Sequence, residues 1–440
     1  PYKELIDSVA SRDMLGLSLA GQSVPGLENA VFSAQGVPDR LNVVDADKEL
    51  VFTWRSDAGV VVEKRYRFTP GSYLVQLFVD IKNGSDRPII DKVVLGIKTD
   101  TGAEKGGYSF EGPCALIDGK LEQVKSKKIK DKSNYPGNIK WLAIVDRYFM
   151  KSLIPLDDTN GAMKLSLDGN GILGNRFVGQ ESAIQPGTQK RFAYEIFFGP
   201  KSTQVLKDVG HDLGKAIHFG MFDIIAKPLL WFMNFIYGKI PNYGIAIIVL
   251  TILTKILLWP LGSKSYKSMS EMKRLQPLMA EIREKHKDDK KMMNQEIMSL
   301  YRTYKINPMG GCLPMVLQIP VFFALYRMLY QAIELRHAPF FLWINDLSAP
   351  DRLFNFSFSI PFMQPPYGIP VLTVIMGATM LLQQKMSPPP GDPTQAKMMM
   401  LMPIVFTVIF INFSSGLVLY WLVNNVLSMA QQTYIQKKYA

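Results

Sequence analysis

The stretch Tyr243–Trp259, YGIAIIVLTILTKILLW, decides the fold of this chain. Its unbroken apolar character and its length predict a helix that crosses a membrane, because a bilayer core needs about 20 such residues. Lys255 is the one charged residue inside it. A charge at membrane depth costs roughly 2.5–3.5 kcal/mol on insertion scales, so it normally faces a polar cavity or a partner.

Lys255 has two interpretations. It lies about six residues from the predicted end of the span at Leu261, roughly 9 Å at helical rise, so its long stem could carry the ammonium out to the headgroups. Alternatively, it lines a water-filled cavity among the helices. No Asp, Glu or His occurs in any of the spans predicted below, so the sequence shows no charged partner. Both interpretations stay open on this residue alone.

Hydrophobicity is spread unevenly along the 440 residues, which carry a formal net charge of +12 and are 48% hydrophobic. Up to about Pro200 the chain is typical of a water-soluble domain, and beyond Ile225 long apolar runs dominate. Five of these runs approach the length of a membrane span. They are Asn242–Leu261, Pro308–Ile333, Ile369–Lys385, Met398–Phe413 and Gly416–Ile435.

Flanking charge predicts the orientation of the spans. The segment Lys264–Lys305 holds eleven Lys and Arg against six Asp and Glu, a net of +5. The segment Glu334–Ile369 holds only two basic residues against three acidic ones. We therefore predict a multi-pass membrane protein, with basic loops and the C-terminus in the cytoplasm and the N-terminal domain on the opposite side of the membrane.

An external N-terminal domain needs a way across the membrane, yet the sequence starts at Pro1 without an apolar signal segment. We expect a first span or signal to precede Pro1. The two cysteines, Cys114 in the outer domain and Cys312 inside a predicted span, form no disulfide framework.

Residues 1–202 alternate in the manner of β-strands. Many short strands at regular spacing, with almost no helix, predict an antiparallel sandwich. The predicted strands are Glu49–Ser56, Gly59–Phe68, Tyr73–Asn83, Val93–Thr99, Trp141–Val145, Tyr148–Pro155, Ala162–Leu167 and Arg191–Phe198. We find no catalytic constellation here, which favours a docking or spacing module.

A junction, residues 203–240, links this domain to the five-span core, residues 241–440. Leu206–Ile217 has helical spacing, and Ile225–Tyr237 carries aromatic residues close to the first span. The second stretch predicts an interfacial amphipathic helix on the outer surface.

The basic segment 264–305 predicts a cytoplasmic hairpin of two amphipathic helices. Met269, Met272, Met279 and Ile282 share one helical face, and Met293, Ile297, Leu300 and Tyr304 share another. One interpretation is a solvated charged connector. The other is a contact surface for ribosomal RNA, lipid headgroups or an emerging chain, without sequence-specific DNA binding. The candidate contacts are Lys273, Arg274, Lys285, Lys290 and Lys291.

Polar residues recur at helical spacing inside the spans. Thr251 shares a face with Lys255, and the last span carries a polar stripe. Singly, such residues act as helix–helix contacts worth about 0.6 kcal/mol each. A stripe together with an unpaired lysine favours a shared polar groove. The candidate groove residues are Lys255, Thr251, Gln318, Tyr420, Trp421, Asn424, Ser428 and Gln431.

From about Phe219 to Gln436 the chain resembles the YidC–Oxa family of membrane protein insertases. The resemblance is carried by Met269–Pro277 (MSEMKRLQP), Tyr304–Gln318 (YKINPMGGCLPMVLQ), Ile319–Leu325 (IPVFFAL), Ala338–Asp346 (APFFLWIND), Gln384–Pro388 (QKMSP) and Gly416–Tyr420 (GLVLY). The outer domain is similar to the periplasmic β-supersandwich of Gram-negative members, most visibly at Trp141–Pro155 (WLAIVDRYFMKSLIP).

The resemblance implies an α+β membrane protein: a periplasmic antiparallel β-supersandwich, followed by a five-helix transmembrane bundle with a cytoplasmic helical hairpin. It implies insertion and folding of nascent inner-membrane proteins through a hydrophilic groove open to cytoplasm and lipid, alone or with the Sec translocon. Membrane lipids and the ribosome are further partners. The family's groove cation, usually arginine, falls at Lys255, which keeps the charge but lacks the planar fork.

Two other classes fit less well. A secondary transporter, the alternative we retain, would present intramembrane acids or an inverted repeat around a midplane site. An intramembrane enzyme would need a His or carboxylate to activate a nucleophile such as Ser414 or Ser415, and the spans contain neither. We expect a non-enzymatic protein with no cofactor and no metal.

Overall fold

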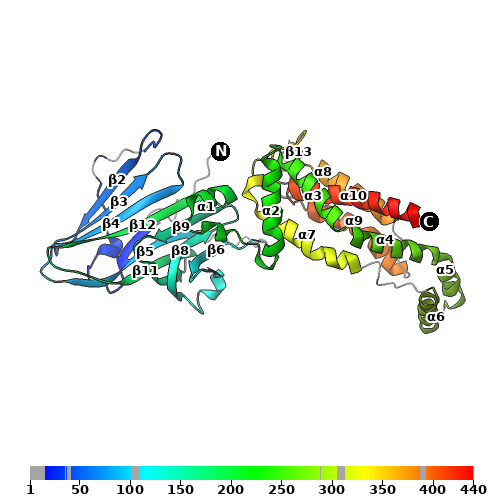
Figure 1. The fold of residues 1–440 in the computed structure, drawn as a ribbon, viewed down its shortest axis with the longest axis horizontal. Helices are drawn as coiled ribbons and strands as arrows, with labels where there is room; N and C mark the ends of the chain where they lie inside the picture. The colour runs from blue at the N-terminus through cyan, green and yellow to red at the C-terminus, as the bar shows by residue number, and fades with distance from the viewer. Residues whose placement is uncertain are drawn as a thin grey trace. The chain divides into compact units, whose positions relative to one another are not determined.

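The computed structural model describes residues 15–34, 36, 41–100, 109–287, 289–304, 313–386 and 393–439, with the backbone alone at 290, 313–317, 393–397 and 439. The contacts divide the chain into two compact units, Pro1–His218 and Phe219–Ala440 (Figure 1). The first unit is built on strands and the second on helices. The predicted boundaries at 202 and 240 stay a prediction, but the division by contacts lies between His218 and Phe219.

Every strand pair in the first unit is antiparallel. The strands are β1 (Leu15–Leu19), β2 (Lys48–Arg55), β3 (Val60–Phe68), β4 (Leu74–Asn83), β5 (Ile89–Asp100), β6 (Gly112–Ile117), β7 (Lys120–Gln123), β8 (Asn134–Val145), β9 (Phe149–Pro155), β10 (Asn160–Leu167), β11 (Ile172–Ile184) and β12 (Gln189–Pro200).

One continuous sheet folds over to make both layers, in the order β1-β5-β11-β10-β8-β9-β12-β4-β3-β2. Strand β8 joins the layers, because its first half pairs with β10 and its second half with β9 and β6. Gly137 lies at this passage with φ of 152°, and an added Cβ would press on Ile117. The predicted sandwich is therefore confirmed as a sandwich-like half-barrel.

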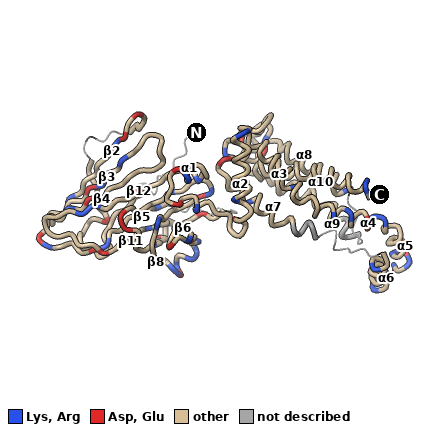
Figure 2. Tube along the Cα trace, viewed as in Figure 1, with Lys and Arg blue, Asp and Glu red and all other residues tan. Residues whose placement is uncertain are grey.

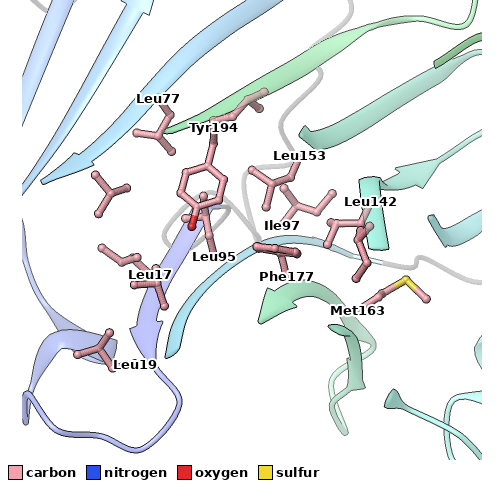
Figure 3. Close-up of a cluster of buried hydrophobic side chains, with 14 of the residues drawn as sticks. Leu17, Leu19, Leu77, Leu95, Ile97, Leu142, Leu153, Met163, Phe177 and Tyr194 are labelled. Carbon is pink, nitrogen blue, oxygen red and sulfur yellow. The ribbon is translucent and has the colours of Figure 1, made fainter. Parts of the chain in front are cut away.

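The core of the first unit lies between the layers and is almost wholly aliphatic (Figure 3). Period-2 alternation fills it: Val60 and Val62 of β3 point inward while their neighbours are partly exposed. Phe177 and Tyr194 meet edge to face, with ring centroids 6.4 Å apart. Burial of this much apolar surface stabilises the unit without disulfides.

A second cluster covers the other side of β8, β9 and β12. Helix α1 (Thr203–Val209) and the 3-10 turn η4 (Leu213–Ala216) pack Leu206 and Leu213 against Trp141 and Phe197. The stretch Leu206–Ile217, which has helical spacing, is not one continuous helix, because α1 ends before Gly210, whose φ is 81°.

Each of the eight predicted strands is present, with ends shifted by one to several residues. Strands β1, β6, β7 and β11 were not predicted. In β11, glycines and polar residues interrupt the alternation, although Asn175 is fully buried and donates to the Ala143 carbonyl at 2.9 Å.

The second unit contains the helices α2 (Asp223–Tyr237), α3 (Tyr243–Leu257), α4 (Trp259–Arg274), α5 (Gln276–Lys285), α6 (Lys290–Thr303), α7 (Leu313–Gln331), α8 (Val371–Met386), α9 (Pro393–Phe410) and α10 (Ser415–Tyr439), and a hairpin of β13 (Leu353–Phe356) with β14 (Tyr367–Ile369). Across the described residues, no helix alone combines the length and hydropathy of a membrane crossing. Taken together, helices α3 and α4 have the length and hydropathy of a membrane crossing, but they are bent by 66° relative to each other. Met398–Phe410 is a shorter apolar helix.

The break between α3 and α4 falls at Leu258, inside the predicted span. Pro260 stands in the first turn of α4 and lacks the N–H that would continue α3. A second break follows at Leu275, before Pro277 in α5. The predicted first helix of the basic hairpin is therefore two helices. The pairing across the hairpin, α5 with α6, is as expected.

Helix α10 is the centre of the second unit and packs against α3, α4 and α8. Helix α2 lies against α3 and α7, and α9 lies against α8. Helix α9 ends at Phe410 and α10 begins at Ser415, so the connection between them is short. The Ser415 hydroxyl fixes the start of α10 by donating to the Ala349 carbonyl at 2.6 Å.

Candidate functional site

Helix α3 carries the site residue that the sequence singled out. The Asn242 side chain caps its first turn by accepting the Ile245 N–H at 3.1 Å. Branched apolar residues fill most of the helix, and its two threonine hydroxyls are hydrogen-bonded within the helix itself. Thr251 donates to the Ile247 carbonyl at 2.6 Å, and Thr254 donates to the Thr251 carbonyl at 2.9 Å. These threonines therefore cost little where they are buried.

The Lys255 ammonium points toward α10. Nζ donates to Ser428 Oγ at 2.6 Å and to Asn424 Oδ1 at 3.3 Å. Only 8% of Lys255 is exposed. The snorkelled orientation, with the ammonium reaching past the end of the helix, is therefore not the one adopted here.

Helix α10 supplies one polar face toward this lysine. Asn424, Ser428 and Gln431 follow each other at helical spacing, so they lie on one side of the helix. Gln431 is 1% exposed and donates to the Trp259 carbonyl at 3.0 Å. Trp259 is the first residue of α4, so this hydrogen bond ties α10 to the start of α4.

Further buried polar contacts extend the cluster to α4 and α8. The Tyr266 hydroxyl of α4 is hydrogen-bonded to Ser428 and Gln383. Asn425 donates to Thr379 Oγ1 at 3.3 Å, and Gln432 donates to the Met386 carbonyl at 3.1 Å. We call the polar side chains shared by these four helices the polar seam, namely Thr251, Lys255, Tyr266, Thr379, Gln383, Asn424, Asn425, Ser428, Gln431 and Gln432.

Tyr420 and Trp421 stand one to two turns before the seam residues of α10. Tyr420 is 7% exposed. Trp421 packs in an aromatic cluster, with its ring centroid 4.8 Å from that of Phe322 on α7 and 5.1 Å from that of Phe410 on α9. Its indole N–H is buried without a hydrogen-bond partner in the described part of the chain. Trp421 thus faces α7 and α9 rather than Lys255.

The candidate groove residues therefore separate into groups. The structure brings Lys255, Asn424 and Ser428 into direct contact and places Thr251 one turn away on the same helix. Gln318 of α7 is half-buried and makes no hydrogen bond to the seam within the residues that the structure describes. Tyr266 was missed by the sequence reasoning because it follows the bend at Leu258, beyond the predicted span.

The seam has an unbalanced charge. In the described segments, no carboxylate pairs with Lys255, and its hydrogen-bond partners are neutral oxygens. Neutral acceptors satisfy the N–H donors of an ammonium without cancelling its field. The arrangement can therefore attract a negative group that enters the seam.

The candidate hairpin residues lie on the surface of the second unit. Lys273 and Arg274 end α4, and Lys285 ends α5. Lys285 pairs with Glu296 of α6 at 3.5 Å, and the Tyr301 hydroxyl donates to Met279 Sδ at 3.5 Å. Lys291 is exposed in the first turn of α6, while the side chain of Lys290 lies outside the described residues.

Comparison with known proteins gives matches to both units. Residues 235–440 match the family model for the 60Kd inner membrane protein, and residues 4–232 match the model for the YidC periplasmic domain. A membrane protein insertase YidC of Syntrophus aciditrophicus is 44% identical over 427 residues, covering 96% of this chain and 76% of that protein. The chain belongs to the YidC family of membrane protein insertases.

Other relatives of this YidC-family chain agree. The membrane protein insertase YidC of Geotalea uraniireducens is 46% identical over 391 residues, covering 88% of this chain and 71% of that protein. A crystal structure of an active YidC insertase with its first transmembrane domain resolved is 21% identical, with a TM-score of 0.42, over 91% of this chain and 83% of that chain. At that score the likeness carries no structural argument.

Family membership confirms the resemblance inferred from the sequence. The family consists of membrane protein insertases, so this chain is an insertase and not an enzyme in the catalytic sense. The strand-built first unit followed by a helical second unit also agrees with the family's periplasmic domain and membrane part.

Proposed function

We propose that the chain inserts nascent proteins into the bacterial inner membrane, with α3, α7, α8, α9 and α10 as its transmembrane helices. The charge distribution supports this topology. Lys and Arg gather on α4 to α6 and at the C-terminal end of α10 (Figure 2). Because basic segments stay in the cytoplasm, the hairpin and the C-terminus are cytoplasmic and the strand-built unit is periplasmic.

The polar seam serves as the hydrophilic groove of the family. The observation that carries this proposal is the hydrogen bonding of Lys255, a mostly buried cation held by the neutral oxygens of Ser428 and Asn424. A structural lysine would be expected to pair with an acid, because an uncompensated charge is costly at membrane depth. A positive charge on Lys255 without an acidic partner suits a site that binds an acidic group of the substrate.

Insertion then proceeds by partition rather than by chemistry. The seam lowers the cost of drawing a short hydrophilic tail partway into the bilayer, and Lys255 attracts acidic residues in that tail. Coulomb attraction at 4 Å is worth about 1 kcal/mol in water and about 4 kcal/mol near a protein surface. The substrate's apolar segment moves into lipid along α7 and α9, where each buried CH₂ gains about 0.8 kcal/mol.

Helix α9 has the surface that this step requires. Its exposed side chains include Met398, Leu401, Ile404, Val405 and Ile409, all apolar. A helix with so much exposed apolar surface matches lipid or a passing apolar segment better than water. The α5–α6 hairpin, with exposed lysines and adaptable methionines, serves as the cytoplasmic contact for the ribosome or the emerging chain. The Sec translocon and membrane lipids are the other partners we propose.

The test is insertion by purified protein reconstituted in liposomes. The substrates are two versions of a small single-span protein, one with an acidic tail and one with a neutral tail. Lys255→Ala should slow insertion of the acidic version about tenfold, which corresponds to about 1.4 kcal/mol. The neutral version should insert at nearly the wild-type rate. Lys255→Arg should retain most of the rate, because it keeps the charge.

Lys385→Ala is the matched control. Lys385 is exposed at the end of α8, so its loss removes one positive charge without touching the seam. Equal insertion of both substrates by Lys255→Ala would remove the electrostatic part of the proposal. Failure of the wild-type protein to insert either substrate would oppose the insertase proposal itself.

A further inference from the structure

The β13–β14 hairpin between α7 and α8 presents large apolar side chains to solvent. Leu353 pairs with Ile369, and Phe356 pairs with Tyr367. The exposed fractions are 68% for Phe354, 62% for Phe358 and 81% for Phe362. We propose that this hairpin is a lipid anchor whose phenylalanines insert into the outer membrane interface and hold the ends of α8 and α9 at that depth. The inference rests on the proposed topology, which places this loop outside.

The hairpin has a defined shape. An added Cβ at Gly368 would collide with the Phe354 carbonyl oxygen, so only glycine allows the two strands to approach this closely. Asn412 holds the tip from both sides: its Nδ2 donates to the Phe362 carbonyl at 2.8 Å, and its Oδ1 accepts the Gln364 N–H at 2.8 Å. Phe358 stacks on Phe356 with ring centroids 5.2 Å apart. The exposed rings are thus presented by an ordered element.

Polar contacts tie the base of the hairpin to the ends of two helices. Arg352 donates to the Pro366 carbonyl in the hairpin and to the Ile411 carbonyl just past α9, both at 2.8 Å. The Asp351 carboxylate accepts the Leu372 N–H in the first turn of α8 and the Trp343 indole N–H. A force that fixes the depth of the hairpin therefore also fixes the depth of α8 and α9.

Two of the exposed phenylalanines have an unusual backbone conformation, which supports a functional reason for their exposure. Phe354 and Phe362 have φ of 59° and 63°, in the left-handed region that bulky residues rarely adopt. Such conformations persist only where the surrounding structure imposes them, and they often mark functional positions. In water these two residues would combine an unfavourable backbone with an exposed ring. Insertion into lipid removes the second cost.

Lipid fits this surface better than a protein partner does. The sequence contains no charged residue from Leu353 through Gln384, so no charge separates the hairpin from the apolar helix α8 along the chain. Exposed Ile369, Val374 and Ile375 carry the apolar surface from the hairpin onto that helix. Aromatic residues occur at protein interfaces as well as in membrane anchors, but a protein interface is surrounded by a polar rim, whereas this surface continues into exposed apolar residues.

Spin labelling of the full chain tests the proposal. Cysteines replace Phe358 or Phe362, one at a time, in a Cys114→Ala, Cys312→Ala background. The protein is placed in bilayers of phosphatidylethanolamine and phosphatidylglycerol, and collisions with oxygen and a water-soluble nickel complex are measured. Val44→Cys, exposed in the strand-built unit, is the water reference, and Ile404→Cys, exposed on α9, is the lipid reference.

We expect labels at 358 and 362 to collide with oxygen more than with nickel, as at 404 and opposite to 44. A preference for nickel would overturn the proposal. Poor access to both reagents would also overturn it, because protein would then cover the hairpin, either the strand-built unit or a second copy. The four labelled sites are exposed, so single cysteines should leave the fold intact.

A second variant tests the anchoring itself. The triple change Phe354→Ser, Phe358→Ser, Phe362→Ser should shift a label at Ile409, near the end of α9, toward nickel access. An unchanged label at 409 would show that the rings do not hold the helix end. Neither readout needs a substrate, so a failed anchor leaves the liposome insertion result intact, and failed insertion leaves the depth measurement intact.

Discussion

At the scale of single residues, Lys255 is distinguished by what surrounds its ammonium. Ser428 and Asn424 accept two of its three N–H donors, and neither carries a charge. The hydrogen-bond donors of the ammonium are therefore largely satisfied, while its positive charge is not neutralised. This separation of hydrogen bonding from charge neutralisation allows a resident cation to be stable and still attract an incoming acid.

Asp91 shows the opposite arrangement in the strand-built unit and gives a pH prediction. Burial alone would raise the pKa of this carboxyl, but hydrogen bonds from the Ser23 hydroxyl and from the backbone N–H groups of Gly21, Ser23 and Lys92 outweigh it and hold the pKa below its ordinary value of 3.8. A lowered pKa stabilises the fold above the unfolded value, and the stabilisation is lost as pH falls through the folded value.

Residues 20–23 follow β1 and are held against β5 by Asp91. Asp91→Asn should therefore lower the stability of this contact by about 1.5–3 kcal/mol near neutral pH. The difference from wild type should shrink as pH falls below about 3.8. Hydrogen exchange of residues 17–24 in the full chain, together with urea unfolding, measures both effects. Asp47→Asn is the control, because its ion pair with Arg67 is exposed and should contribute about 0–1 kcal/mol. A constant difference across the pH range would contradict the assignment.

The sequence identified Lys255 and the α10 stripe because both depend only on helical spacing within an apolar run. It could not identify Tyr266, which reaches Ser428 only because the chain bends between α3 and α4. Nor could spacing tell that Trp421 joins Phe322 and Phe410 in an aromatic cluster. These contacts depend on the rotation of α10 against its neighbours, which a single helix pattern does not contain.

At the scale of elements, the packing of α8 on α9 depends on a small residue. An added Cβ at Gly377 would collide with Thr407 Oγ1 and lie 3.1 Å from Thr407 Cγ2. Close helix contacts of this kind are typical of membrane proteins, where small residues let the backbones approach. The Thr407 hydroxyl already donates to the Pro403 carbonyl at 2.7 Å, so it has little freedom to move.

Gly377→Ala should destabilise the second unit by about 1–3 kcal/mol through overpacking. Adding Thr407→Ala should recover part of this loss, because it removes the colliding atoms. The thermal midpoint of the protein in detergent measures both variants. Gly238→Ala is the control, since Gly238 has helical φ and ψ and an added Cβ would meet only ordinary contacts. Additive losses in the double variant would rule out the proposed contact.

Strands and helices were predicted correctly where the hydrophobic residues recur at regular spacing, and they were missed where that spacing is interrupted. The alternating runs of β3 and β4 were predicted nearly to their ends. Strand β11 was missed because its pattern is broken, and pairing with β5 and β10 decides its conformation. The helical spacing of 206–217 does not produce one helix, because Gly210–Asp212 are three consecutive residues with positive φ.

At the scale of the whole molecule, the split between a water-soluble regime and an apolar one predicted two structural parts. The strand-built and helical units correspond to these parts. The sequence could not place the division between His218 and Phe219, because α1 has helical spacing yet packs on the strands of the first unit. Orientation across the membrane stays a prediction from flanking charge.

The central claim is that position 255 faces water that enters from the cytoplasm. A Lys255→Cys variant in the Cys114→Ala, Cys312→Ala background tests it directly with a membrane-impermeant maleimide, applied to vesicles of each orientation. We predict labelling when the reagent is on the cytoplasmic side and none when it is on the periplasmic side, with Ile404→Cys as the lipid-facing, unlabelled reference. Absence of labelling from both sides, or labelling only from the periplasmic side, would contradict the account.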